Sequence, residues 1–164
     1  MFFRFQKPKK ITTLTADSVQ TTAGRVVAPS TVNIPGTDIS CVCYWQLIEA
    51  WKQPARKKGR KMWIPQSARQ GCKGFYVEDD TGKIWVPDNG DVLDIRNGWQ
   101  DGGLMGKKGT QRFVARSIKP GDVIKIRGRI SESKGAEPAD CLVFRPDDKG
   151  MVTILQTKKA KKQG

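Results

Sequence analysis

The chain of 164 residues contains no histidine. Histidine is the side chain whose ordinary pKa lies closest to neutral pH, so the commonest general acid and base of enzymes is missing. The candidate carboxylate pairs are Asp79-Asp80 and Asp147-Asp148. Both pairs lie in segments that predict turns, where aspartate is favoured for backbone reasons. We therefore expect a protein that is not an enzyme and that has no cofactor.

Long apolar runs are also absent. No segment approaches the roughly 20 apolar residues that a membrane-spanning helix needs. The apolar start of the chain, residues 1–3, is followed at once by Arg4 and is too short for the apolar part of a secretory signal. These features predict a soluble, cytoplasmic protein.

Paired C-x-x-C sequences, which are typical of zinc sites, do not occur. The four cysteines are Cys41, Cys43, Cys72 and Cys141. Cys41 and Cys43 alternate with Val42 and Tyr44 in a β-favouring run, which predicts that both thiols point to one face of a strand. We interpret the cysteines as buried, reduced thiols; a disulfide pair and a metal site are the open alternatives.

A β-hairpin is predicted over residues 74–87, GFYVEDDTGKIWVP. β-Favouring side chains lie on both sides of the turn at residues 79–82, and Pro87 ends the second strand because it has no N–H. A two-residue turn places Tyr76 opposite Trp85 on the outer face. A glycine bulge at Gly82 shifts the register by one residue and sends Trp85 into the core instead.

Further strands are predicted at 21–28, 39–51, 123–130, 141–144 and 151–155, and a short one at 11–19. A helix competes for the last third of 39–51. Together with the hairpin, this order predicts an all-β fold, an OB-like small β-barrel with a long basic loop and disordered basic tails. The expected organisation is a basic arm at 1–10, one barrel domain at 11–156 and a basic tail at 157–164.

Residues 52–71 contain Pro54, Gly59, Pro65 and Gly71, which predict a long loop rather than a strand. The apolar residues 62–64 inside it either pack back on the barrel or contact a partner. The segment 88–117 is rich in glycine, and we expect order only near 92–95 and 112–115.

The net charge of +14 is concentrated in a few segments. Residues 1–10, 52–61 and 157–164 carry fourteen lysines and arginines and no acid, so the rest of the chain is neutral. Such segments are often only solvated, but they also suit nucleic acid or an anionic membrane surface.

The order and spacing of several motifs resemble a known family. GRVVAPS (24–30), the stretch from Pro35 to Gln46, FYVEDDTGKIWVP (75–87), IKPGDVIKIRG (118–128) and VTIL (152–155) look like the GIDE domain, the membrane-adjacent domain of the mitochondrial ubiquitin ligase MULAN and of prokaryotic membrane proteins. The resemblance covers residues 20–156 and implies a β-rich interaction domain. The chain lacks the family's transmembrane helices and zinc-binding RING, so ligase activity is not implied.

The leading hypothesis is a basic, non-catalytic OB-fold protein that binds nucleic acid, either RNA (an RNA-binding protein) or single-stranded DNA. Cations would contact phosphates and exposed aromatic rings would stack on bases. The candidate residues are Lys52, Arg56, Lys57, Lys58, Arg60, Lys61, Trp63, Arg69, Tyr76, Lys83 and Trp85. The alternative is a GIDE-like domain that docks on a protein complex or an acidic membrane surface. A structural subunit of a ribonucleoprotein is a third possibility.

Overall fold

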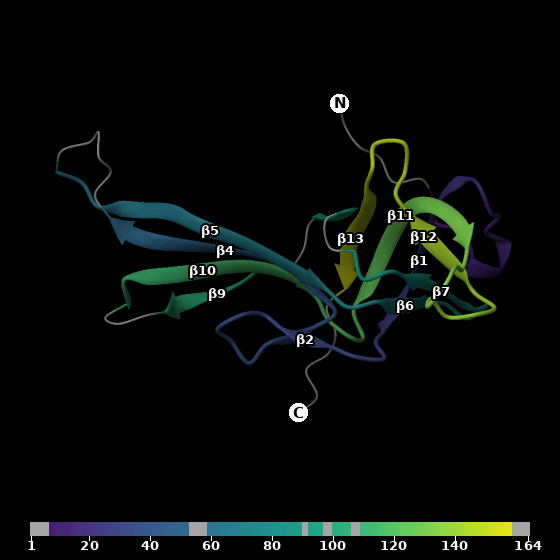
Figure 1. Cartoon of the computed structure of the whole chain (residues 1–164), viewed down its shortest axis with the longest axis horizontal. Coiled ribbons are helices and arrows are strands. Elements are labelled where there is room, and N and C mark those ends of the chain that lie inside the picture. The colour runs from purple at the N-terminus through teal and green to yellow at the C-terminus, as the bar shows by residue number, and fades with distance from the viewer. Residues whose placement is uncertain (1–6, 53–58, 90–91, 97–99, 106–108, 159–164) are drawn as a thin grey trace.

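The structure, a computed structural model, describes residues 7–52, 59–89, 92–96, 100–105 and 109–158. Strands make up 59% of it and helices 4%, which confirms the all-β prediction. The molecule is elongated, with a barrel at one end and a long, flat sheet that projects from it (Figure 1). We call the projecting sheet the extension.

Five strands close the barrel in the order β1-β6-β7-β12-β11, with β11 returning to β1. The pair β7–β12 is parallel and the other pairs of the ring are antiparallel. This is an OB-like barrel, as predicted. The strands are β1 (Val19–Val27), β6 (Phe75–Glu78), β7 (Lys83–Val86), β11 (Val123–Glu132) and β12 (Leu142–Arg145). The sheet continues from β11 through β13 (Val152–Lys158) to β8 (Leu93–Arg96), which is its last strand.

The barrel core follows from strict alternation along the strands. In β11 every second residue is buried, so that Ile124, Ile126 and Ile130 point inward. The β6–β7 hairpin adds Phe75, Val77, Ile84 and Val86 to the same cluster. The short 3-10 helix η1 (Ile11–Thr13) contributes the buried Ile11.

The extension is built from two insertions into the barrel. The first, between β1 and β6, contains β2 (Val32–Asn33), β3 (Ser40–Cys41), β4 (Cys43–Lys52) and β5 (Met62–Cys72). The second, between β7 and β11, contains β9 (Gln100–Met105) and β10 (Gln111–Ile118), as well as β8. The four long strands pair in the order β5-β4-β10-β9 and are antiparallel throughout. Segments far apart in the sequence therefore share one sheet.

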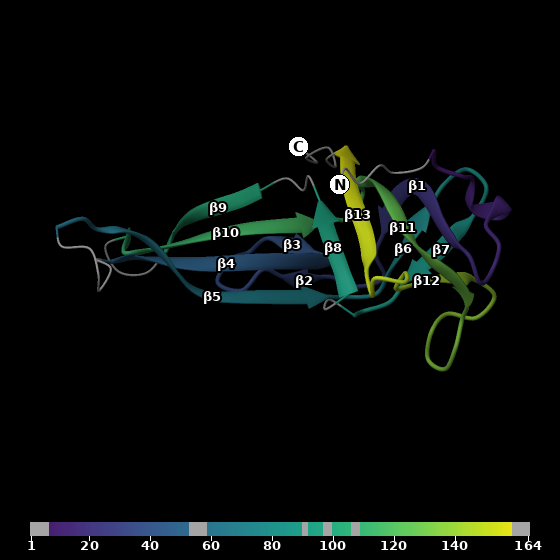
Figure 2. The same cartoon turned by 90° about the horizontal axis from the view of Figure 1, so that it is seen from above.

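The two faces of the extension have different surroundings. On one face, β2 and β3 lie against the sheet, where Ile34, Cys41 and Ala115 form a small buried cluster (Figure 2). The Gln46 amide reinforces this contact by donating a hydrogen bond to the carbonyl of Pro35 at 2.9 Å. The opposite face carries the partly exposed Trp45 and Trp51. We call this second face the open face.

The prediction of a loop over residues 52–71 was wrong for residues 62–71, which belong to β5, whereas the described residues 59–61 are not in a strand. Pro65 is tolerated for two reasons: β5 is the edge strand of its sheet, and the register with β4 shifts between Ile48 and Glu49, beside Pro65. The apolar residues 62–64 pair with Ala50, Trp51 and Lys52 of β4, not with the barrel.

In the glycine-rich segment, β9 is an additional strand that the sequence did not predict. The predicted strand at 11–19 was also wrong, since residues 11–13 form the helix η1 and β1 begins at Val19. At the other end, β13 runs to Lys158, beyond the predicted end of the barrel.

The predicted strand at 39–51 is divided by a bend at Val42, and no helix forms in its last third. β4 is central in its sheet, with Trp45 and Trp51 partly exposed on one of its faces. The two thiols do not share one environment. Cys41 packs in the small cluster of the extension, whereas Cys43 belongs to the barrel core. The bend at Val42 separates them.

Candidate nucleic-acid interface

The β6–β7 hairpin has the register of the two-residue turn. Tyr76 pairs with Trp85 and Val77 pairs with Ile84, while Asp79 N–H donates to the Gly82 carbonyl at 3.0 Å. The inward side chains are those that this register predicts, and both aromatic rings lie on the outer face. The alternative with a glycine bulge is therefore wrong.

Asp79 holds this turn closed. One carboxylate oxygen accepts hydrogen bonds from the Thr81 N–H at 2.7 Å, the Thr81 hydroxyl at 2.6 Å and the Gly82 N–H at 3.0 Å. The other accepts from the Ile11 N–H at 2.8 Å and so ties η1 to the hairpin. Burial alone would raise the pKa of Asp79, but these hydrogen bonds outweigh it, and the pKa lies below its ordinary value.

The Tyr76–Trp85 pair has little free ring surface. The rings meet edge to face with centroids 4.8 Å apart, and the Lys83 ammonium lies 4.4 Å from the centroid of the Tyr76 ring. Trp85 also packs over Gly74, where a Cβ would lie 2.1 Å from the Trp85 ring. Each ring is half-buried. These contacts are those of a stabilising cross-strand pair.

The open face of the extension offers more aromatic surface. Residues that pair directly across antiparallel strands share a face, so the register defines its members. From the barrel end to the far end, these are Gln70, Trp45 and Arg116; Ala68, Leu47 and Val114; Pro65, Glu49 and Arg112; and Trp63 and Trp51. Trp45 is 38% exposed and Trp51 is 44% exposed. Tryptophan at such exposure is typical of a contact surface.

Arg112 organises the far end of the open face. Its guanidinium lies 4.5 Å from the centroid of the Trp63 ring, and its Nε donates to the Glu49 carboxylate at 2.8 Å. Trp63 in turn contacts Trp51, with ring centroids 5.3 Å apart and planes tilted by 57°. Glu49, Arg112 and Trp63 thus hold Trp51 in place at the edge of this cluster.

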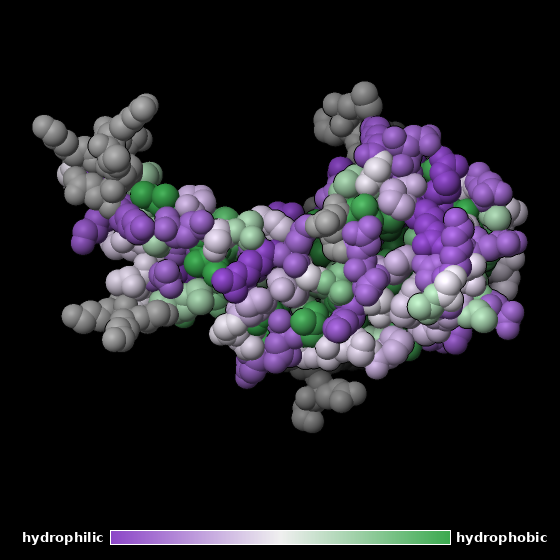
Figure 3. All heavy atoms as spheres, in the orientation of Figure 1, coloured by the Kyte–Doolittle hydropathy of each residue, from purple (hydrophilic) through white to green (hydrophobic). Residues whose placement is uncertain are grey.

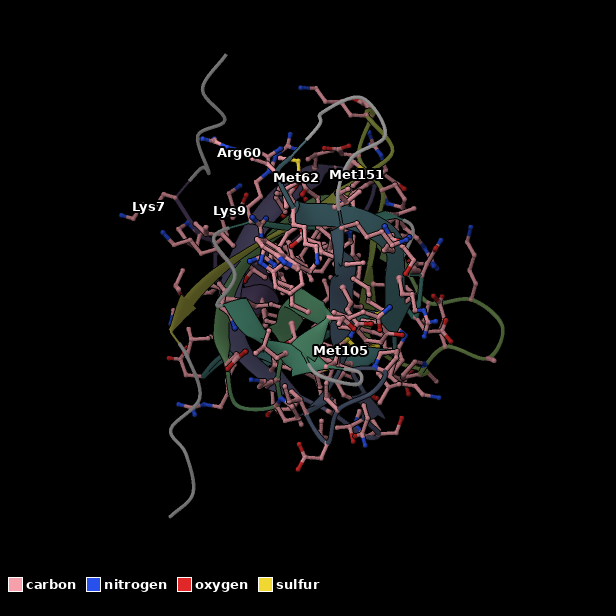
Figure 4. The ribbon with its side chains drawn as sticks, turned by 90° about the vertical axis from the view of Figure 1, so that its left-hand side faces the viewer. Lys7, Lys9, Arg60, Met62, Met105 and Met151 are labelled. Carbon is pink, nitrogen blue, oxygen red and sulfur yellow. The ribbon has the colours of Figure 1, made fainter. Side chains whose placement is uncertain are left out.

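Positive charge surrounds these rings. Lys52, Arg60 and Lys61 are exposed at the end of the extension farthest from the barrel, and Figure 4, which looks along the extension from that end, shows Arg60 beside Met62. Residues 59–73 contain four lysines and arginines and no acid. In Figure 3 the extension presents apolar residues next to strongly hydrophilic ones. This is the combination that single-stranded nucleic acid requires.

At the barrel end of the open face lies a cavity of about 250 Å³. Trp45, Gln70 and Arg116 of the extension line it together with Leu93, Asp94 and Ile95 of β8. The Arg116 guanidinium reaches the Ile95 carbonyl at 3.5 Å and so connects the two parts of the molecule across the cavity.

The predicted site residues fall into two separate groups. Lys52, Arg60, Lys61, Trp63 and Arg69 lie on β4, on β5 or at their far end, whereas Tyr76, Lys83 and Trp85 lie on the barrel, at the opposite end of the molecule (Figures 1 and 2). The structure thus does not bring the hairpin rings beside Lys52, Arg60 or Lys61. Arg56, Lys57 and Lys58 lie outside the described residues.

The sequence analysis missed Trp45, Trp51, Arg112 and Arg116. Both tryptophans lie in a β-favouring run with apolar residues on both of its faces, a pattern that does not distinguish a buried ring from an exposed one. A usable signal was present: apolar pairs flank the basic segment symmetrically, as Ala50-Trp51 and Trp63-Ile64. Such symmetry is typical of a long hairpin.

The described thiols and carboxylates form no disulfide and no cluster of metal ligands. All four cysteines are free, with Cys41 and Cys43 buried. The pKa of Cys43 is raised by its contact with the Cys72 thiol and by burial. Among the described residues, no three cysteines or acids lie together as metal ligands do, and no helix is long and apolar enough to cross a membrane.

Comparisons with protein-family models, with curated proteins and with solved structures found no match to the chain. The resemblance to the GIDE domain therefore stays a prediction, and the function rests on the geometry of the open face.

Proposed function

We propose that this protein is a non-catalytic nucleic-acid-binding protein and that it holds a single strand along the open face of the extension. Bases stack on the exposed Trp51 and Trp45 rings, and phosphates pair with the surrounding cations. The observation that carries the proposal is the exposure of two tryptophans on a face that is bordered by arginine and lysine.

The charge of the open face supports an anionic ligand. Within the described part of β4, β5 and β10, the register places Arg112 and Arg116 on this face with one acid, Glu49, which is already paired with Arg112. Lys52 and Arg69 alternate with these residues and belong to the opposite face of the same strands. Lys52, Arg60 and Lys61, which are exposed at the far end, extend the positive region beyond this face. A single strand of nucleic acid that runs from Trp51 to Trp45 therefore has cations at both ends of its path.

The outer face of the barrel hairpin is the competing site. OB barrels commonly bind oligonucleotides on their strands 2 and 3, which correspond to β6 and β7 here. Glu78 and Asp80 are exposed on this hairpin, and Lys83 already covers the Tyr76 ring. Both features disfavour phosphates and stacked bases, so the extension is the better candidate.

The direct test is a fluorescence anisotropy titration of a labelled, unstructured uridine 20-mer at several salt concentrations. Binding should weaken steeply, with a slope of log affinity against log salt of about −3 if four phosphates are neutralised. A matched DNA duplex should bind more weakly, because its bases cannot stack on tryptophan. Lack of binding to the 20-mer at about 50 mM salt would refute the proposal.

A second candidate function is docking on an anionic membrane surface, as the GIDE resemblance predicts. It is favoured by Met62 and Leu104, which are apolar and exposed to 42% and 70% on the extension. Apolar side chains next to cations also suit a lipid headgroup layer. Sedimentation with vesicles that contain or lack acidic lipid tests the second function. If the vesicles bind at the open face, the uridine 20-mer should compete with them for the protein.

A further inference from the structure

We propose that the cavity between β8 and the extension is a base-specific subsite that binds one guanine of the single strand. The inference rests on the proposed function, because the strand delivers the base along the open face. The cavity lies where that face ends, and Trp45 belongs to both. Its volume of about 250 Å³ and its mixed lining suit a flat, polar ring.

The cavity has an apolar part and an aromatic wall. Leu93 and Ile95 supply aliphatic side chains from β8, and Trp45 supplies the exposed indole ring. A base that enters between them keeps its faces against apolar surface and its edge free for hydrogen bonds. This arrangement accounts for binding of a base but does not select one.

Selection comes from the polar groups. Arg116 presents a planar fork of N–H donors, and within the described part of the chain its one hydrogen bond is the 3.5 Å contact to the Ile95 carbonyl. Asp94 presents a carboxylate that only accepts, and its partner Arg96 occupies one side of it at 2.8 Å. Gln70 adds an amide at the opposite wall.

Guanine is the base whose polar groups match both side chains. Its N1–H and N2–H₂ groups are adjacent donors that a carboxylate can accept together, and its O6 and N7 are adjacent acceptors that an arginine fork can address. Adenine, cytosine and uracil each present a single donor group, so none of them can pair with the carboxylate through two adjacent donors. The second hydrogen bond that guanine makes to each side chain, and that the other bases cannot make, is the basis of discrimination.

The test compares a uridine decamer with the same decamer that carries a single central guanosine. The single guanosine should tighten binding about tenfold, the effect of one bidentate contact. Asp94→Asn should bring the two decamers to within about twofold of each other. Arg116→Lys keeps the charge but loses the fork, so it should also reduce the preference for guanosine.

Asp88→Asn is the matched control, because Asp88 is exposed on the segment before β8 and does not line the cavity. It should keep the full preference. A urea unfolding curve for each variant confirms that the fold is intact.

The possible failures can be told apart. If the uridine decamer binds but guanosine brings no gain, or if Asp94→Asn keeps the gain, the guanine subsite is refuted and the proposed function stands. If neither decamer binds, the proposed function itself fails. Guanosine monophosphate that binds as tightly as the guanosine decamer would overturn the assignment to a strand.

Discussion

Trp51 and Trp63 face each other across β4 and β5 with ring centroids 5.3 Å apart, at the end of the extension that lies farthest from the barrel. The pair does not belong to either buried cluster of the molecule. Two large rings in that position add little to the stability of the barrel. Their place in the molecule therefore supports the proposal that they bind the ligand.

Trp51→Ala should weaken binding of the uridine 20-mer by about 5- to 100-fold, since one stacked base contributes about 1 to 3 kcal/mol. Tyr76→Ala, which removes an aromatic ring from the barrel face, is the comparison and should change the affinity less than about twofold. Anisotropy titrations measure both. The reverse ranking would assign the site to the β6–β7 hairpin.

The double variant Arg60→Gln/Lys61→Gln should reduce the steepness of the salt dependence by about 1, because two phosphate contacts are lost. The control Lys134→Gln/Lys149→Gln makes the same charge change at two exposed positions on the barrel. It should leave the slope unchanged. Equal effects of the two variants would mean that net charge, not the extension, determines binding.

Asp79→Asn should lower the free energy of unfolding by about 1 to 2 kcal/mol at pH 7, because the neutral amide cannot accept all the hydrogen bonds of the carboxylate. The folded-state pKa of Asp79 is lowered. Its stabilisation is therefore complete above the unfolded pKa of about 3.9 and is lost as the pH falls through the folded pKa.

Urea unfolding at pH 7 and below pH 3 measures this difference, which should shrink at the lower pH. Asp80→Asn is the control, because Asp80 is exposed and makes one ion pair, to Lys10 at 2.6 Å. It should cost less than about 0.5 kcal/mol. A difference between Asp79→Asn and the native protein that persists unchanged below pH 3 would argue against the carboxylate as its cause.

Gly24→Ala should destabilise the barrel by about 2 kcal/mol or more. β1 pairs with β11 on one side of Gly24 and with β6 on the other, and an added Cβ would lie 2.3 Å from the Glu78 carbonyl oxygen. Gly82→Ala places its Cβ 3.6 Å from the nearest atom and should cost much less. Thermal unfolding of the two variants checks the ranking, and equal melting temperatures would contradict it.

The barrel could be predicted from the sequence because its signals are local. Alternation along 123–130 and the turn at 79–82 are each contained in about ten residues. The turn left two registers open, and the structure selects the one that pairs Tyr76 with Trp85. The extension depends instead on pairing between β4 and β10, in which Trp45 lies opposite Arg116. No short sequence pattern encodes a contact over that distance along the chain.

The candidate site could be predicted only in part, because only some of its signals are local in the sequence. The cations at 52–61 stand out by composition, whereas the exposure of Trp45 and Trp51 depends on which face β2 and β3 cover. β5 was not predicted because it contains Pro65. Proline ends most strands, but it is accepted in an edge strand such as β5. The cavity requires β8 and β10 side by side, which only the folded chain reveals.

The most direct test of the open face is ultraviolet cross-linking of a 4-thiouridine 20-mer to the native protein, followed by peptide mapping. Adducts should concentrate in residues 43–52, 62–72 and 111–118, on Trp51 and Trp45 first. Adducts confined to residues 75–86 of the barrel hairpin would contradict the account.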